Sequence, residues 1–277
     1  MRAHPMPNEE KPVPVSSSVP AIVPVEQEDL FRQVLQSLAA APIPFVVAGA
    51  FAMRAHTGIC RFTKDLDLFL PAEHVPSALH RLEQEGFRCE VPDVVWLAKA
   101  HQGDFFVDLI SGMSNAVIIV DQSWMERGVA ATLFDVPCKV LAPEELIASK
   151  LFVTRRERFD GADIAHILYC SGSRLDWERL LELAGEHWEI LLWSLVLFQY
   201  VYPASSELVP RAVWNELLGR LQHTLANPNP RAPFRGSLID PNMFAIDVNE
   251  WGMEDVLEHY RERREPKIVM KNVKPAA

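Results

Sequence analysis

The chain has 277 residues, 49% of them hydrophobic and 23% charged, and it carries a formal net charge of −10 at pH 7. This length and composition are typical of a globular protein with a substantial core, and the acidic balance argues against a main role in binding duplex DNA. Four cysteines without a Cys-x-x-Cys pair argue against a disulfide framework or a zinc site and favour a reduced, cytoplasmic setting.

The N-terminal residues 1–25 contain six prolines and a run of three serines, which predicts a disordered tail. Acidic residues and prolines stand where a secretory signal would need an apolar core, so we do not expect secretion. The most apolar stretch, residues 190–202, is too short to span a bilayer and contains Gln199. We therefore expect a buried helix there and no membrane association.

Residues 26–142 alternate between helical and strand patterns, which predicts a mixed α/β domain. A helical pattern over residues 26–41 precedes FVVAG at 45–49, a β-branched run that ends in glycine and leads directly into the helix-forming AFAMRAH. A helix is also predicted at residues 73–86. Further strands are predicted at residues 65–70, 87–91, 94–100, 105–111, 116–120 and 138–141.

From Pro143 onward the pattern is helical, and we expect an all-helical domain over residues 143–225. Its first segment, residues 143–170, predicts two helices with a break near residues 159–161. An irregular and partly helical extension is expected over residues 226–277. Three further helices are predicted at residues 175–185, 186–202 and 211–225.

Three aspartates lie within the predicted strands. Because strand side chains alternate, Asp65 and Asp67 of DLDLFL share one face, and Asp108 stands among apolar residues in FFVDLIS. On adjacent strands these carboxylates would repel one another and have raised pKa values unless a cation lay among them. Magnesium is the expected cation, and two such ions can clamp the attacking and leaving oxygens of a nucleotidyl displacement. A solvated or salt-bridged surface is the alternative account of the Asp-x-Asp pair.

The turn at Gly49 and Ala50 gives the aspartates a functional context. A strand that passes through glycine into a helix offers free backbone N–H groups to phosphate oxygens. Together these motifs, FVVAGAFAMRAHTGICRFTKDLDLFL, resemble the signature of the nucleotidyltransferase fold, or polymerase-beta-like superfamily. The pattern is most similar to the AbiEii-like bacterial nucleotidyltransferases, and the resemblance covers about residues 26–170.

This resemblance implies an α/β (α+β) nucleotidyltransferase fold with a mixed sheet, followed by an all-helical C-terminal domain. It implies the Mg²⁺-dependent transfer of a nucleoside monophosphate from an NTP such as ATP to an acceptor hydroxyl, with release of pyrophosphate. The acceptor stays open among a small molecule, tRNA and a protein. Two alternatives are the toxin of a toxin–antitoxin pair, which would have a cognate antitoxin, and a degenerate nucleotide-binding module without turnover.

The resemblance also implies roles for single residues. Asp65, Asp67 and Asp108 would bind two Mg²⁺ ions, and Asp108 would favour deprotonation of the attacking hydroxyl. Gly49 and Ala50 would present backbone N–H groups to the β and γ phosphates. Ala50 stands where the family usually has a second glycine or a serine, so a hydroxyl ligand is absent while the backbone N–H remains.

Further nucleotide contacts are implied for Arg61, Thr63 and Lys150, with Asp163 orienting Lys150 or another group of the site. Structural alternatives stay open, because Arg61 can pair with a surface acid and Lys150 can be solvated on its helix. His56, near the end of the first domain's second helix, is predicted to pack rather than to act as a base.

Three arginines of the segment 143–170, Arg155, Arg156 and Arg158, form a cationic cluster that can contact phosphates. A charged helix surface beside neighbouring acids explains them equally well. The tryptophans of the helical domain are predicted to lie in the core or between helices rather than to stack on bases.

Overall fold

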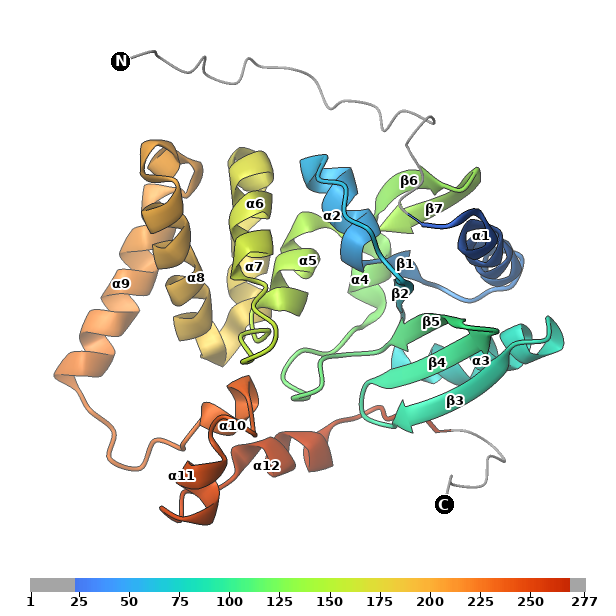
Figure 1. Ribbon diagram of the computed structural model, residues 1–277. Coiled ribbons are helices and arrows are strands. Elements are labelled where there is room, and N and C mark those ends of the chain that lie inside the picture. Colours follow the sequence, from blue (N-terminus) through green and yellow to red (C-terminus); the bar gives the residue numbers. More distant parts are fainter. Residues whose placement is uncertain (1–22, 270–277) are drawn as a thin grey trace.

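The computed structural model describes residues 23–269, and Figure 1 shows a sheet on one side of the molecule and a group of helices on the other. Most of the tail predicted for residues 1–25 lies outside the described residues. Val23 is buried and the first helix begins at Val25, so the end of that range belongs to the folded part. Within residues 23–269, no helix is long and apolar enough to cross a membrane.

Seven strands form one mixed sheet in the order β3-β4-β5-β2-β1-β7-β6. The pairs β2–β5 and β1–β7 are parallel, and the other four neighbouring pairs are antiparallel. The strands are β1 (Val46–Val47), β2 (Asp65–Phe69), β3 (Arg88–Asp93), β4 (Leu97–Gln102), β5 (Phe105–Ile110), β6 (Val129–Leu133) and β7 (Val136–Val140).

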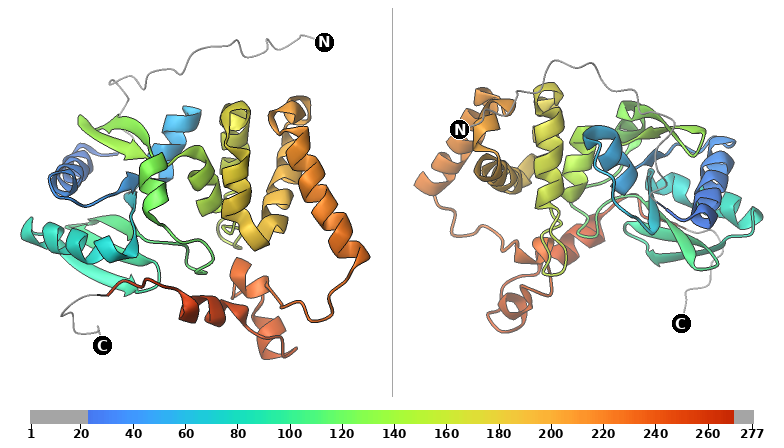
Figure 2. Two further views of the ribbon diagram at one scale, coloured as in Figure 1. Left: turned by 180° about the vertical axis from the view of Figure 1, so that it is seen from behind. Right: turned by 45° about the horizontal axis from the view of Figure 1, so that its top comes forward.

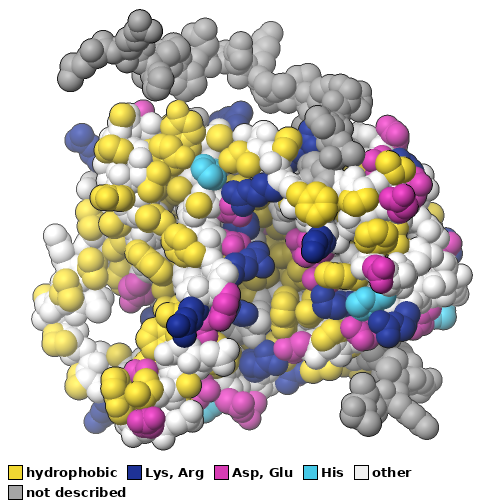
Figure 3. Space-filling view, in the orientation of Figure 1, with side chains coloured by type: hydrophobic (Ala, Val, Ile, Leu, Met, Phe, Trp, Pro, Cys, Tyr) yellow, Lys and Arg dark blue, Asp and Glu magenta, His cyan; other side chains and the backbone are white. Residues whose placement is uncertain are grey.

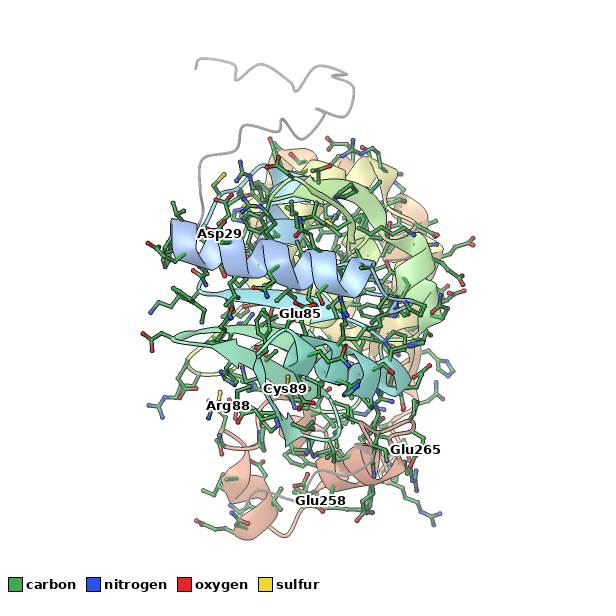
Figure 4. The ribbon with its side chains drawn as sticks, turned by 90° about the vertical axis from the view of Figure 1, so that its right-hand side faces the viewer. Asp29, Glu85, Arg88, Cys89, Glu258 and Glu265 are labelled. Carbon is green, nitrogen blue, oxygen red and sulfur yellow. The ribbon has the colours of Figure 1, made fainter. Side chains whose placement is uncertain are left out.

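Alternation along β2 separates an apolar face from a carboxylate face. Leu66 and Leu68 are fully buried, whereas Asp65 and Asp67 on the opposite face are half-buried. The helices α1 (Val25–Ala39) and α3 (Val75–Gln84) pack side by side against the sheet, as Figure 4 shows. The apolar positions of the pattern predicted for α1 are all buried, namely Leu30, Phe31, Val34, Leu35 and Leu38.

The helical group lies next to the carboxylate face. The helices α2 (Gly49–Thr57) and α5 (Pro143–Lys150) both contact α6 (Gly161–Ser171) and so join the sheet to this group. The predicted α/β fold with a mixed sheet, followed by a helical C-terminal region, is therefore confirmed. The other helices of this region are α7 (Trp177–Ala184), α8 (Trp188–Val201) and α9 (Arg211–Ala226).

Helix α8 is only partly the buried helix predicted for residues 190–202. Leu195 and Phe198 are fully buried, but Trp193 and Tyr200 are exposed. A helix at the outside of a bundle buries only the stripe that faces its neighbours, so a nearly continuous apolar sequence does not by itself imply complete burial.

After α9 the chain turns back toward the sheet, as the two further views in Figure 2 show. It forms the short helices α10 (Gly236–Ile239), α11 (Ala245–Asn249) and α12 (Val256–Arg263). The backbone N–H of Ile268 then donates to the Val94 carbonyl at 2.8 Å, which places the end of the described chain beside the β3–β4 turn.

Residues 116–120, predicted as a strand, instead form a loop with one isolated bridge between Gly112 and Ile119. Ile118 is buried nonetheless. The Asn115 side chain accepts the Val117 N–H at 3.1 Å and fixes a turn at this point. Apolar β-branched residues therefore specify burial here, whereas the asparagine specifies the backbone conformation.

The break between the two helices predicted over residues 143–170 is longer than the sequence suggested. Helix α5 ends at Lys150, and residues 153–160 form a short hairpin with a bridge between Thr154 and Phe159. The three arginines of this segment lie on the hairpin, so their assignment to a helix surface is wrong. The short helix α4 (Gln122–Arg127) and strand β6 were not predicted.

Candidate active site

The three predicted aspartates converge at the centre of the sheet. In the parallel β2–β5 ladder, Asp67 lies directly opposite Asp108, and Asp65 is two residues earlier on the same face of β2. One carboxylate oxygen from each residue lies within 4.8 Å of the other two. The β2–β5 pairing thus brings together residues that are about 40 positions apart in the sequence.

Gly49 allows the start of α2 to lie directly against this cluster. Its φ of +56° is in the left-handed region, and a Cβ at this position would overlap the Asp67 carboxylate. The N–H of the preceding Ala48 donates to the Asp67 carbonyl at 2.9 Å and fixes the approach. Glycine is therefore required here both for the backbone conformation and for the space that Asp67 occupies.

Burial and mutual repulsion make the charged form of these carboxylates unfavourable. Burial, followed by the charges of Asp65 and Asp108, raises the pKa of Asp67 to about 7. Burial also raises the pKa of Asp108, although the neighbouring Lys99 opposes this effect. A hard divalent cation prefers carboxylate oxygens and would relieve the repulsion, so the donor set fits magnesium.

Lys99 is a member of the site that the sequence reasoning missed. Its Nζ donates to Asp108 Oδ1 at 2.6 Å and lies 4.3 Å from the centre of the Phe106 ring. The two-residue turn between β4 and β5 places Lys99 directly opposite Asp108. Gly103 and Asp104 at this turn are a recognised hairpin signal, and counting the register back from them would have identified the pair.

A second charged cluster lies beside the triad. Lys150 is buried, and its Nζ is 2.7 Å from Asp160 Oδ2 and 2.9 Å from Asp163 Oδ2. Arg61 pairs with the other oxygen of Asp163, and Arg158 Nε lies 3.0 Å from Asp160 Oδ1. Three cations and two carboxylates give the cluster a net charge of +1. Asp160 was not singled out in the sequence.

Two other predicted residues make local contacts. Thr63 Oγ1 donates to Asp65 Oδ1 at 2.7 Å, so this hydroxyl holds the first carboxylate of the triad. His56 Nε2 lies 2.6 Å from the Leu141 carbonyl, and burial lowers the pKa of this imidazole. His56 is thus packed at the end of α2 and joins that helix to the chain after β7.

All the residues predicted for the site line one cleft of about 790 Å³. In Figure 3 acidic and basic side chains gather between the helical group on the left and the sheet on the right. The C-terminal residues 237–242 line the same cleft, which the sequence did not indicate. The predicted site residues in the cleft are Gly49, Ala50, Arg61, Thr63, Asp65, Asp67, Asp108, Lys150 and Asp163.

A carboxylate triad on a mixed sheet, beside a helix that opens at glycine, is the arrangement that nucleotidyl transfer requires. The family model described as "Nucleotidyl transferase of unknown function (DUF2204)" matches residues 27–183, more than half of the chain. The chain belongs to this family. The predicted resemblance to nucleotidyltransferases is confirmed, whereas the closer similarity to AbiEii-like members stays a prediction.

Solved structures with weaker similarity include the antibiotic-resistance factor ANT(2'')-Ia, at 18% identity and a TM-score of 0.42 over 73% of this chain and 97% of that chain. An antigenic nucleotidyltransferase-like protein from Paracoccidioides brasiliensis is 16% identical, with a TM-score of 0.41 over 66% of this chain and 91% of its own. JHP933 from Helicobacter pylori is 14% identical, with a TM-score of 0.37, and the match covers 74% and 97%. A comparison with curated proteins finds no match.

Proposed function

We propose that the protein transfers a nucleoside monophosphate from a nucleoside triphosphate to a hydroxyl group of an acceptor, in a magnesium-dependent reaction that releases pyrophosphate. The observation that carries this proposal is the convergence of Asp65, Asp67 and Asp108 within 4.8 Å, next to the helix that opens at Gly49. Carboxylates and free backbone N–H groups at one point match the needs of magnesium and phosphate.

Asp65, Asp67 and Asp108 would hold the magnesium, and the proposed number is two ions. When bound, the metal supplies positive charge that neutralises the carboxylates and the phosphate oxygens. The N–H groups of Gly49 and Ala50, at the start of α2, face the β and γ phosphates in this arrangement. The methyl group of Ala50 leaves that N–H contact intact.

The group transfer makes one bond to phosphorus and breaks another. The acceptor oxygen bonds to the α-phosphorus, the bond from that phosphorus to the oxygen bridging it to the β-phosphate breaks, and pyrophosphate leaves with the electron pair. The hydroxyl proton passes to the Asp108 carboxylate and then to solvent.

Arg61 and Arg158 are better placed than Lys150 to contact the triphosphate. Their side chains are 45% and 68% exposed, and each has one carboxylate partner that orients it. Lys150 is only 6% exposed, and its ammonium group is held between Asp160 and Asp163. In this proposal Lys150 positions the two acids, the acids position the arginines, and the net positive charge attracts the phosphates.

The test uses magnesium, each α-labelled NTP in turn and a cell extract as the source of acceptors. The wild type is compared with Asp67→Asn and with Asp135→Asn, which removes an exposed carboxylate at a turn where asparagine is well tolerated. We expect label in an acceptor fraction with the wild type and Asp135→Asn but not with Asp67→Asn. Bound NTP without any transferred label would contradict the proposal.

A further inference from the structure

The C-terminal strap, defined as residues 236–264, forms a fixed wall of the cleft. It lies outside the residues 27–183 that match the family. Arg261 Nη2 lies 2.8 Å from Asp93 Oδ2, and its Nη1 donates to the Ser114 carbonyl at 2.7 Å. The Asn115 side chain donates to the Leu238 carbonyl at 2.9 Å. These bonds join the strap to the sheet edge and to the loop after β5, at sequence separations of more than 100 residues.

On the side of the strap, apolar side chains join the lining of the cleft. Two residues after Asp108, on the same face of β5, stands Ile110, and the cleft continues with Met113 and the half-buried Trp96. Gly49 and the cluster around Lys150 lie in the other half. The carboxylate triad stands between the charged half around Lys150 and the strap half, which adds apolar side chains. Two substrates would have to meet there.

An aromatic side chain in the charged half can hold the nucleoside. Phe62 lines the cleft and is 67% exposed, although large aromatic side chains are usually buried. Aromatic faces of this kind stack on nucleobases irrespective of their sequence. A nucleotide with its phosphates at Gly49 and Arg61 and its base near Phe62 leaves the strap half free for the acceptor.

Ser237 supplies a buried polar group without a partner in the strap half. The residue is 1% exposed and lines the cleft, and its Oγ has no hydrogen-bond partner among the described residues. A buried hydroxyl without a partner is unfavourable, so such a group marks a place where a ligand can complete the hydrogen bonding. An apolar pocket with a few convergent polar groups is the usual form of a small-molecule site.

Size and charge define the acceptor. A cleft of about 790 Å³ lies within the range of roughly 300–1,000 Å³ found for small-molecule sites, and here it must hold the nucleotide as well. The charged side chains of the strap half sum to zero, namely Asp93, Asp240, Arg261 and Arg155, whose Nη2 donates to Ser114 Oγ at 2.6 Å. This half therefore lacks the net positive charge that favours a polyanion such as RNA. We propose that the strap, with Ser237, forms the acceptor subsite, and that the acceptor is a small, partly apolar molecule bearing a hydroxyl group.

This inference rests on the proposed function, and its test separates the two. Labelled ATP and magnesium are incubated with the dialysable, RNA and protein fractions of a cell extract, for the wild type, Ser237→Ala and Phe62→Ala. Calorimetry measures ATP binding to each protein. We expect label in the dialysable fraction and, for Ser237→Ala, an increase of about three- to tenfold in the amount of that fraction needed for half-saturation, as for one lost hydrogen bond. ATP affinity should fall with Phe62→Ala and stay unchanged with Ser237→Ala.

The other outcomes are distinct. Label only in the RNA or protein fraction would overturn the small-molecule acceptor and leave nucleotidyl transfer standing. Weaker ATP binding by Ser237→Ala would assign the strap half to the nucleotide and overturn the acceptor subsite. ATP binding without label in any fraction would overturn the proposed function itself. Since the Ser237 hydroxyl has no partner among the described residues, Ser237→Ala should not lower the melting temperature. An unchanged melting temperature would exclude unfolding as the cause of a transfer defect.

Discussion

Lys99 Nζ lies 2.6 Å from Asp108 Oδ1, so the third carboxylate of the triad is held by a cation from the neighbouring strand. Lys99→Met should lower the rate of transfer at limiting magnesium by about tenfold or more, because the partners that orient metal-binding carboxylates typically contribute that much. The magnesium dependence of the rate is the measurement. Lys139→Met is a matched control, since Lys139 lies on β7 and bonds only main-chain carbonyls among the described residues. Equal loss in both variants would contradict a specific role of Lys99.

Gly49→Ala should lower both stability and activity. The new Cβ would displace the Asp67 carboxylate, and a shift of about 1 Å at a reacting centre can reduce the rate about 100-fold. Gly103→Ala is the control, because Gly103 has a similar φ of +60° but open space around the added Cβ. Both substitutions carry the cost of a left-handed alanine, about 1 kcal/mol. Thermal unfolding should therefore show a loss in both, and transfer should fail only in Gly49→Ala.

Asp67→Asn should stabilise the metal-free protein while abolishing transfer. The pKa of Asp67 is raised from 3.8 to about 7 in the folded state, so its contribution to stability is complete below pH 3.8 and is lost as the pH rises through about 7. At pH 8 the wild type therefore contains an unfavourable buried carboxylate that the asparagine lacks. The melting temperature of Asp67→Asn in chelator should exceed that of the wild type by a few degrees.

The pH profile provides the control for this effect. The stability difference should be small below about pH 4, should grow as the pH rises from about 4 to about 7, and should be constant above that. Added magnesium should then stabilise the wild type at pH 8 and leave Asp67→Asn almost unchanged, because binding to the native state alone raises stability. A difference between the two proteins that is independent of pH would show that ionisation of the buried Asp67 carboxylate is not its cause.

Local periodicity was sufficient to predict the elements that carry the triad. The strand expected at residues 65–70 corresponds to β2 (Asp65–Phe69), and the strand at 105–111 corresponds to β5 (Phe105–Ile110). In both strands the alternation of apolar residues in the sequence matches the alternation of buried residues in the sheet, so the local pattern and the packing favour the same conformation. The loop at 116–120 has equally apolar residues, but its conformation depends on the side chain of Asn115.

The contacts that complete the cleft could not be derived from local patterns. Arg261 and Asp93 are 168 residues apart, and neither belongs to a short motif. Asp160 pairs with Lys150 only because the hairpin after α5 turns back on that helix. Sequence spacing predicts which side chains share one element, whereas these pairs depend on how separate elements pack.

The ion pairs of Lys150 predict that substitutions of Lys150 and of Arg158 affect different properties, namely stability and substrate binding. Lys150→Met should lower the free energy of unfolding by about 3 kcal/mol or more, because Asp160 and Asp163 would lose the cation between them in a buried site. Arg158→Gln should have little effect on stability, since that side chain is mostly exposed, but should weaken NTP binding about tenfold by removing a charged hydrogen bond.

Chemical denaturation and calorimetry with NTP measure these two quantities separately. Combining Lys150→Met with Asp163→Asn should restore part of the lost stability, because one of the two buried carboxylates that lost the ammonium group is then neutral. If Lys150→Met instead folds with unchanged stability and loses NTP affinity, Lys150 contacts the triphosphate directly. In that case Lys150, rather than Arg61 and Arg158, would be the main cation that binds the phosphates.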